Sequence, residues 1–124
     1  MDSYLIISTS NDLVRIAARH IVCIAADGNY STIFQTNNEL RMVTLQLGQL
    51  ERLIADQLPQ LGQTFIRVGK SLIINSNAVH YINVSKQQLI LMDTLQNRHT
   101  FTAGKEALKT LKEWFENNQD NERN

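Results

Sequence analysis

The sequence predicts a mostly β fold, a β-rich α+β arrangement of small antiparallel sheets with one internal helix and one C-terminal helix. Two observations predict it. Short apolar runs recur between polar or glycine-containing turns, which is typical of strands joined as hairpins. In two longer stretches, apolar residues recur instead at the helical spacings of three and four. The 124 residues suffice for one domain with a substantial core.

The first half of the chain is predicted to hold five strands, at residues 4–8, 13–17, 20–26, 30–36 and 40–43. Asp27-Gly28-Asn29 breaks the apolar run before it, and its residue types tolerate a positive φ. Residues 37–39, Asn-Asn-Glu, predict a hairpin turn between the last two of these strands.

One internal helix is predicted to follow, because four apolar residues share one helical face: Leu47, Leu50, Ile54 and Leu58. Thr44 is predicted as its N-cap, since a threonine hydroxyl can accept from a free amide of the first turn. Pro59 is predicted to end it. The polar face of this helix is interpreted as solvated surface.

The second half is predicted to hold strands at residues 65–68, 72–74, 79–84, 88–92 and 98–102. A last helix is predicted from Lys105 to Asn117, with Leu108, Leu111 and Phe115 as its apolar stripe. The domain is therefore predicted to span residues 1–118. Residues 119–124 are polar and acidic, and are expected to form a disordered tail.

Formal charge is balanced over the whole chain, with twelve Lys and Arg against twelve Asp and Glu. A globally basic protein is thereby excluded. Between residues 63 and 105 the balance is uneven, because Asp93 is the sole acidic residue there. The basic residues of that segment are Arg67, Lys70, Lys86, Arg98 and Lys105. A basic face with an acidic C-terminal end is therefore predicted.

Neither the cysteine nor the histidines indicate a catalytic or metal-binding site. Cys23 is the single cysteine and lies in an apolar run, which predicts a small buried hydrophobe. The histidines are too far apart for a short metal-binding motif, and no phosphate loop or nucleophile motif is present. We expect neither an enzyme nor a bound cofactor or metal. No leader or membrane-spanning run is apparent, so the sequence predicts a cytoplasmic protein without membrane insertion.

Three polar breaks near strand ends are the candidate binding elements, at residues 27–31, 67–71 and 103–105. Each offers a cation, a small hydroxyl or the free amides of a helix start, which are the groups that contact phosphate. Taken singly, each is better interpreted as an ordinary turn or a solvated loop charge. Together they predict a surface that contacts a nucleic acid.

Three segments resemble the LytTR family, the DNA-binding output domains of LytR/AgrA-type bacterial response regulators. They are residues 21–30 (Ile-Val-Cys-Ile-Ala-Ala-Asp-Gly-Asn-Tyr), residues 43–45 (Val-Thr-Leu) before the leucine-rich helix, and residues 65–75 (Phe-Ile-Arg-Val-Gly-Lys-Ser-Leu-Ile-Ile-Asn). The resemblance runs in order over about residues 4–115. Its most specific part is the Phe-x-Arg-x-x-x-Ser-x-x-x-Asn pattern.

The resemblance implies sequence-specific binding of double-stranded DNA by a bacterial transcriptional regulator, through loops that enter successive major grooves of a direct repeat. It assigns base reading to the neighbourhood of Ser31, to Lys70 and to Lys105. Arg67 and Ser71 would hold a loop or touch phosphate. The full set of implied contacts is Asn29, Ser31, Arg67, Gly69, Lys70, Ser71 and Lys105. The chain departs from the family at Gly69, where histidine is common, and at Ala25, where glutamate is common.

The implied partners are direct-repeat DNA, a second copy bound as a homodimer on that DNA, and a separate signalling protein. Because no receiver domain precedes the matched segments in this sequence, we expect a stand-alone DNA-binding domain. A second interpretation stays open. The same basic loops would also suit a protein-interaction or sensing module that binds an acidic protein partner.

Overall fold

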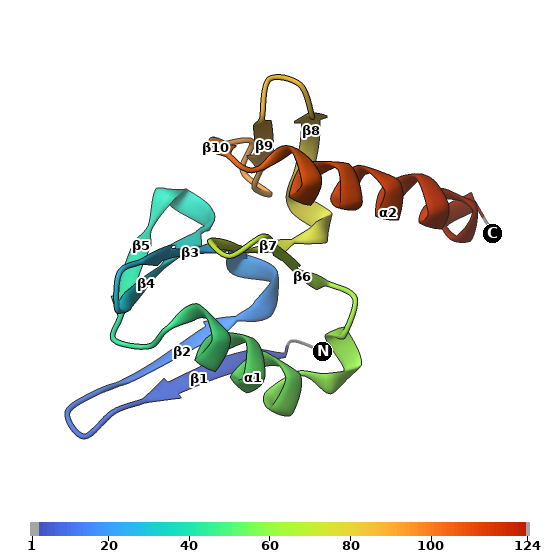
Figure 1. Ribbon diagram of the computed structural model, residues 1–124. Coiled ribbons are helices and arrows are strands. Elements are labelled where there is room, and N and C mark those ends of the chain that lie inside the picture. Colours follow the sequence, from blue (N-terminus) through green and yellow to red (C-terminus); the bar gives the residue numbers. More distant parts are fainter. Residues whose placement is uncertain (1–2, 124) are drawn as a thin grey trace.

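The computed structural model describes residues 3–123, and confirms a fold of small antiparallel sheets with two α-helices. The strands are β1 Tyr4–Ser8, β2 Leu13–Ala17, β3 Ile21–Asp27, β4 Tyr30–Gln35, β5 Leu40–Val43, β6 Phe65–Val68, β7 Leu72–Asn75, β8 Val79–Asn83, β9 Gln88–Met92 and β10 Arg98–Thr102. The helices are α1 Leu47–Gln57 and α2 Lys105–Arg123 (Figure 1). Short 3₁₀ turns join several of these elements.

The strands form three antiparallel sheets. The central sheet has five strands in the order β5-β4-β3-β7-β6. A second sheet has the order β10-β9-β8, and β1 and β2 form a separate hairpin. Every pairing is antiparallel, so neighbouring strands run in opposite directions throughout.

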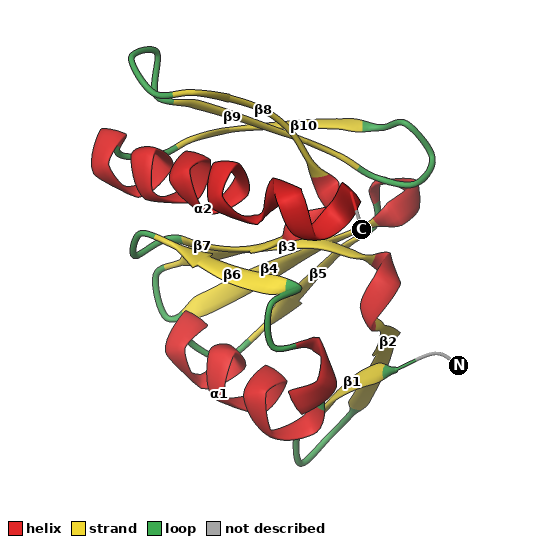
Figure 2. Cartoon of the chain, turned by 90° about the vertical axis from the view of Figure 1, so that its right-hand side faces the viewer, coloured by secondary structure: helices red, strands yellow, loops and turns green. Residues whose placement is uncertain are grey.

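Each face of the central sheet carries its own hydrophobic core. Alternate residues of a strand point to opposite faces. Ile24, Ile33 and Ile73 pack with α1 and the β1–β2 hairpin on one face, whereas Leu72 and Ile74 pack with α2 and the three-stranded sheet on the other. Figure 2 shows this layering, with α1 on one side of the central sheet and α2 on the other. The sheet is thus buried on both faces.

Because of a register shift in β3, one short segment contributes side chains to both cores. The pairing of β3 with β4 is irregular between Ile21 and Cys23, which is where a bulge adds one residue. As a result Ile21 lies in the first core, while Val22 and Cys23 both lie in the second. The predicted burial of Cys23 is confirmed, and burial raises the pKa of its thiol to about 12.

The apolar face predicted for α1 is confirmed, because Leu47, Leu50, Ile54 and Leu58 are all buried. The predicted N-cap at Thr44 is wrong. Gln46 caps the helix instead through a reciprocal capping box with Gln49, whose side chain accepts from the Gln46 amide at 2.8 Å. This pair satisfies two amides at the helix start, so a threonine two residues upstream is not needed there.

The helix α2 continues to Arg123, beyond the predicted end at Asn117. No glycine or proline follows Gly104 to stop it. An i,i+4 ion pair between Lys112 and Glu116 (2.7 Å) supports the second half. None of the described helices is long and apolar enough to cross a membrane.

Candidate nucleic-acid interface

Two of the predicted polar breaks lie next to each other because β3 pairs with β7. Ala25 pairs with Leu72, so the end of β3 lies beside the start of β7. Beyond this pair the Ala26 amide donates to the Ser71 carbonyl oxygen at 2.8 Å. The β3–β4 turn and the β6–β7 loop therefore lie at the same end of the central strands, on the left of Figure 2, and this end forms one edge of the molecule.

The start of α2 reaches the same edge. A Cβ placed on Gly69 would lie 3.6 Å from the Cβ of Ala107, which shows how closely the β6–β7 loop packs on the first turns of α2. The two segments share an open recess of about 220 Å³ lined in part by Lys70, Ser71 and Gly104. The fold thus brings all three predicted breaks together, in the order β3–β4 turn, β6–β7 loop and α2 start (Figure 2).

The side chain of Arg67, which lies on β6, holds the β6–β7 loop in place. Its Nε donates to the Gly69 carbonyl oxygen at 3.1 Å and its Nη2 to that of Lys70 at 3.4 Å. Its Nη1 donates to Glu51 Oε1 on α1 at 2.9 Å. A planar guanidinium can make these three contacts at once, whereas an ammonium cannot. This arrangement fits the loop-holding role that the sequence assigned to Arg67.

Gly69 adopts a left-handed backbone conformation, with φ of +62°. That region costs other residues roughly 1–2 kcal/mol because Cβ approaches the following carbonyl. Glycine avoids this cost. A glycine at this position therefore has a backbone reason, and it lets Lys70 and Ser71 occupy the exposed tip.

Ser31 cannot serve as a direct contact in this structure. It is fully buried, and its hydroxyl donates to the Leu45 carbonyl oxygen at 2.7 Å. Ser31 shares a face of β4 with Ile33, which points into the first core. The expectation that Ser31 reaches a phosphate or a base is corrected: its hydroxyl fixes the chain just before α1.

The exposed side chains of the β3–β4 turn include Asn29 and Tyr30, together with the carboxylate of Asp27. Tyr30 is 46% exposed. Asn29 Oδ1 accepts from Gln46 Nε2 at 3.4 Å, which connects the turn to the first residue of the α1 cap. Sequence reasoning missed Tyr30. The missed signal was alternation: if Ile33 faces inward, Ser31 does too, and Tyr30 and Thr32 share the other face.

Lys86 is a second residue that sequence reasoning left out of the site. It is exposed in the β8–β9 turn. Gln87 ties this turn to the segment before α2, because its Nε2 donates to the Ala103 carbonyl oxygen at 3.3 Å and its own carbonyl oxygen accepts from the Ala103 amide at 3.2 Å. The turn therefore belongs to the same edge of the molecule as Lys70 and Lys105.

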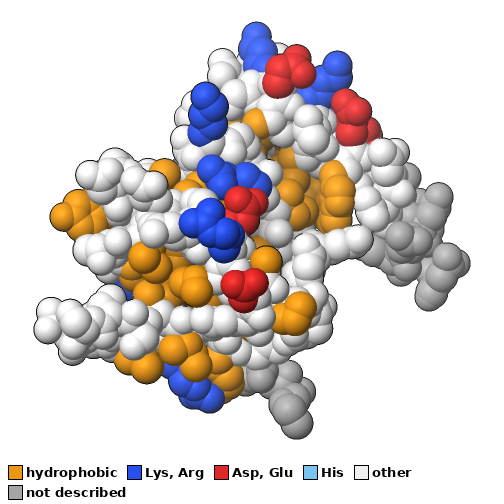
Figure 3. Space-filling view, turned by 60° about the horizontal axis from the view of Figure 1, so that its bottom comes forward, with side chains coloured by type: hydrophobic (Ala, Val, Ile, Leu, Met, Phe, Trp, Pro, Cys, Tyr) orange, Lys and Arg blue, Asp and Glu red, His pale blue; other side chains and the backbone are white. Residues whose placement is uncertain are grey.

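The cations of this edge are available for a partner. Lys70, Lys86 and Lys105 are exposed, and none has an ion-pair partner among the side chains of residues 3–118. On the face drawn in Figure 3, Lys and Arg side chains are interleaved with Asp and Glu side chains. The Arg67–Glu51 pair is of this kind. Lys70, Lys86 and Lys105 therefore give the loops unpaired positive charge.

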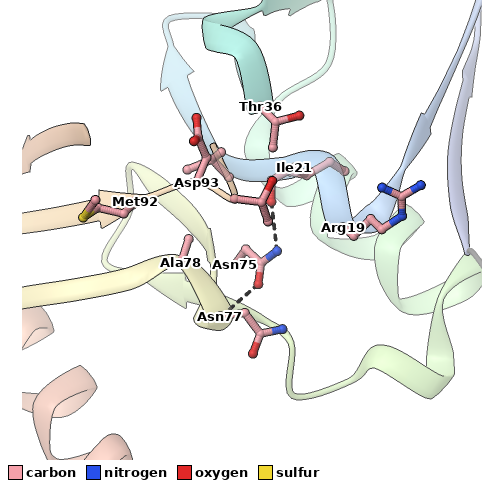
Figure 4. Close-up of a pocket in the computed structure, with 10 residues that line it drawn as sticks. Arg19, Ile21, Thr36, Asn75, Asn77, Ala78, Met92 and Asp93 are labelled. Atoms are coloured by element: carbon pink, nitrogen blue, oxygen red, sulfur yellow. Dashed lines mark hydrogen bonds between the residues drawn. The ribbon is translucent and has the colours of Figure 1, made fainter. Parts of the chain in front are cut away.

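A small pocket lies at the opposite end of the strands, and polar side chains that line it make hydrogen bonds within the protein. Its volume is about 160 Å³, and Asn75 lies at its centre (Figure 4). Asn75 Nδ2 donates to the Ile21 carbonyl oxygen at 3.0 Å, and its Oδ1 accepts from the Asn77 amide at 2.9 Å. The final Asn of the Phe-x-Arg-x-x-x-Ser-x-x-x-Asn pattern therefore joins β7 to β3 and lies far from the loops.

Asp93 lines the same pocket, and its carboxylate also makes hydrogen bonds within the protein. Its carboxylate accepts from the amides of Leu95 and Asn97, each at 2.9 Å, and lies 3.3 Å from His99 Nε2. Burial raises the pKa of Asp93, but these hydrogen bonds outweigh burial and hold the pKa below its usual value. Within the described part of the chain, no group of three or more His, Cys, Asp or Glu side chains could hold a metal ion.

Comparison with known proteins identifies a family and solved structures with a similar fold. The family model for the LytTR DNA-binding domain matches residues 11–116. The fold is similar to that of the LytTr DNA-binding domain of a response regulator from Bacillus cereus, with a TM-score of 0.61 and 16% identity. This similarity covers 90% of the present chain and 94% of the other. No curated protein matches the sequence.

Proposed function

The chain belongs to the LytTR family of DNA-binding domains, and on that premise we propose that it regulates transcription by sequence-specific binding of double-stranded DNA through the loop edge. That edge consists of the β3–β4 turn, the β6–β7 loop, the β8–β9 turn and the start of α2. Its target in a bacterial cell would be chromosomal DNA, so its place of action would be the cytoplasm.

One observation carries the proposal: Lys70 and Lys105 come from segments 35 residues apart, and the fold places their loops beside the same recess. Both lysines are exposed and lack an ion-pair partner among the described side chains. A major groove about 12 Å wide presents guanine acceptors that a lysine can reach. Loops that project together from a rigid sheet can enter such a groove without a recognition helix.

The side chains of the edge divide by the chemistry they offer. Lys70 is exposed on the middle loop of this edge and is assigned to a base, with Asn29 and Tyr30 on the neighbouring turn. An asparagine amide suits adenine, and a phenol offers both a donor and an acceptor. Lys86 and Lys105 lie on the α2 side of Lys70 and are assigned to phosphates, which fix orientation and carry no sequence information. For Lys105 this replaces the base reading that the resemblance implies.

Ser71 and Arg67 are assigned to support rather than to reading. Ser71 is exposed beside Lys70, and its backbone carbonyl is held by β3. A hydroxyl at this place would meet a phosphate oxygen. Arg67 donates hydrogen bonds to the loop carbonyl oxygens and to the carboxylate of Glu51, so its charge is partly neutralised.

The experiment that tests the proposal is selection of binding sites from random duplexes by the purified chain. We expect a recovered motif that occurs as a direct repeat, with centres one helical turn or about 10–10.5 bp apart. Affinity for that duplex should exceed affinity for a scrambled duplex by about 10³-fold or more at physiological salt. If selected and scrambled duplexes bind equally, sequence-specific regulation is rejected. If neither binds, a protein partner for the basic loops becomes the better account.

A further inference from the structure

The strand β5 is an edge of the central sheet, and its outer backbone groups have no partner in the described chain. β5 pairs with β4 on one side only, and Figure 1 shows it at the border of the sheet. The Gln35 amide donates to the Glu39 carbonyl oxygen at 2.8 Å, so the backbone groups of Glu39 point toward β4. Because the direction alternates along a strand, the amide and carbonyl groups of Leu40 and Met42 point outward.

The side chains along this edge are also exposed and unpaired. Leu40 and Met42 are each 60% exposed, which is high for large apolar residues. Glu39 and Arg41 are exposed, and neither has an ion-pair partner among the described side chains. An unprotected strand edge is a template for another strand.

The molecule does protect a comparable edge elsewhere. In β1, the amide of Ile6 donates to Gln57 Oε1 at 2.8 Å, and the Ile6 carbonyl oxygen accepts from Gln57 Nε2 at 2.9 Å. A side chain of α1 thus satisfies the outward backbone groups of β1. No such side-chain cap satisfies the outward groups of Leu40 and Met42 among the hydrogen bonds of the described residues.

We propose that β5 pairs with β5 of a second copy of this chain, antiparallel and centred on Leu40, to form a two-fold dimer. A two-fold pairing of identical strands places a residue opposite its own copy at the axis. Centring on Leu40 places the outward backbone groups of both Leu40 residues face to face, so that they exchange two hydrogen bonds.

Charge selects this register over its neighbours. With Leu40 at the axis, Glu39 lies opposite Arg41 of the second copy, and Arg41 lies opposite Glu39 of the second copy. Centring on Arg41 would instead place two guanidinium groups opposite each other, which is unfavourable. Centring on Met42 would place Arg41 opposite the buried Val43, with no opposite charge. Only the Leu40 register pairs every charge of the strand.

The proposed contact leaves the loop edge free. Leu40 pairs with Phe34 near the end of β4, whereas Ser31 at the other end of β4 pairs with Val43 beside the β3–β4 turn. The dimer axis therefore lies at the end of β5 that is remote from the loops. This inference goes beyond the proposed function, because two-fold related copies do not have the head-to-tail relation of copies on a direct repeat.

The paired segment is short, so the dimer should be weak. A stable protein interface buries about 1,600 Å² in total, and a few residues of strand pairing give much less. We therefore expect dissociation in roughly the micromolar range or weaker.

The test is sedimentation equilibrium of the full chain without DNA, over a wide range of concentration. The wild type should show a reversible monomer–dimer equilibrium. Glu39→Arg and Arg41→Glu should each shift it toward monomer by about tenfold or more, since each creates like-charge pairs. An equimolar mixture of the two variants should associate again, because each chain then meets opposite charges at both positions. Circular dichroism verifies that both variants are folded, and Lys112→Glu, a charge reversal on α2, should leave the equilibrium unchanged.

Three results would overturn the proposal: a wild type that stays monomeric at all concentrations, single reversals that dimerise as the wild type does, or a mixture that fails to associate. Since DNA is absent throughout, the outcome is independent of whether the chain binds DNA. The same variants should also keep the affinity of the wild type for a single half-site, which separates the two conclusions.

Discussion

Arg67 of β6 and Glu51 of α1 form an ion pair, with 2.9 Å between Nη1 and Oε1, while the remaining nitrogens of Arg67 hold two carbonyl oxygens of the β6–β7 loop. One side chain therefore joins a helix, a strand and the loop that carries Lys70. The position of the proposed reading residue depends on this geometry as well as on charge.

Arg67→Lys keeps the positive charge and removes the planar fork, so it tests geometry alone. We expect DNA affinity to fall by about tenfold, or ~1.4 kcal/mol, with an unchanged dependence on salt. The free energy of unfolding should change by less than about 1 kcal/mol, because the ion pair is partly exposed. Fluorescence anisotropy at several salt concentrations measures affinity and its salt dependence, and urea denaturation measures stability. Arg52→Lys on α1 is the control, and equal binding by both variants would exclude the holding role.

Lys70 and Lys86 should respond differently to truncation. Lys70→Ala should cost about 1–3 kcal/mol on the selected site and relax the preference at one base position. Lys86→Ala should weaken selected and scrambled duplexes alike and reduce the slope of log affinity against log salt by about 1. Titrations on both duplexes separate the two outcomes. A uniform loss for Lys70→Ala would reassign that residue to the phosphate backbone.

Ser31 and Tyr30 are adjacent, and their variants should have opposite effects. Ser31→Ala removes a buried hydrogen bond to the Leu45 carbonyl oxygen and should lower the free energy of unfolding by about 1–3 kcal/mol, with DNA affinity retained. Tyr30→Ala should leave stability within about 0.5 kcal/mol and weaken DNA binding. Urea denaturation and anisotropy give the comparison. Normal DNA affinity in Tyr30→Ala would remove that side chain from the interface.

Gly69 and Gly48 offer a matched pair of glycine-to-alanine substitutions. Gly69→Ala should destabilise the protein by roughly 1–2 kcal/mol, because φ is +62° there. The added Cβ itself meets Ala107 at an ordinary 3.6 Å. Gly48 lies in α1, and a Cβ added there would meet nothing within 4 Å, so Gly48→Ala should stabilise by about 0.5–1 kcal/mol. Thermal or urea unfolding measures the change in stability for each variant. An unchanged stability in Gly69→Ala would show that the loop relaxes.

Acid should remove the contribution of Asp93 to stability. Its pKa in the folded chain lies below the usual value, so the folded state favours the carboxylate. The contribution is therefore complete above the pKa of the unfolded chain and is lost as pH falls through the lower pKa of the folded chain. Asp93→Asn should flatten the urea midpoint across this acidic range relative to the wild type. An unchanged acid dependence would place the responsible carboxylate elsewhere.

Most strands could be predicted from the sequence because each is bounded by clear turn chemistry. The predicted limits of β1, β2, β5 and β9 agree with the structure, and Asn37 in the predicted 37–39 turn has a positive φ. The helix starts and ends were harder, because they depend on competition between neighbours. Gln46 displaced Thr44 as the cap, and α2 continued through a polar run that the sequence suggested would fray.

The sequence located the elements of the candidate site, and one of its residues, Ser31, proved to be buried. The three polar breaks were identified, but nothing local in the sequence states that β3 pairs with β7, which is what brings them together. The alternation of β4 would have placed Ser31 inside had Ile33 been taken as the reference. Lys86 could not be found from the sequence because its turn reaches the edge through backbone contacts with Ala103, from a different sheet.

The two cores on either face of the central sheet make the loop edge part of one cooperative unit. β3 and β7 contribute alternate side chains to both cores, and the Gly69–Ser71 segment leads directly into β7. A local opening of the edge would have to disturb the packing on both sides of the sheet at once. Fluctuations that loosen either helix should therefore reach the start of β7, next to Lys70.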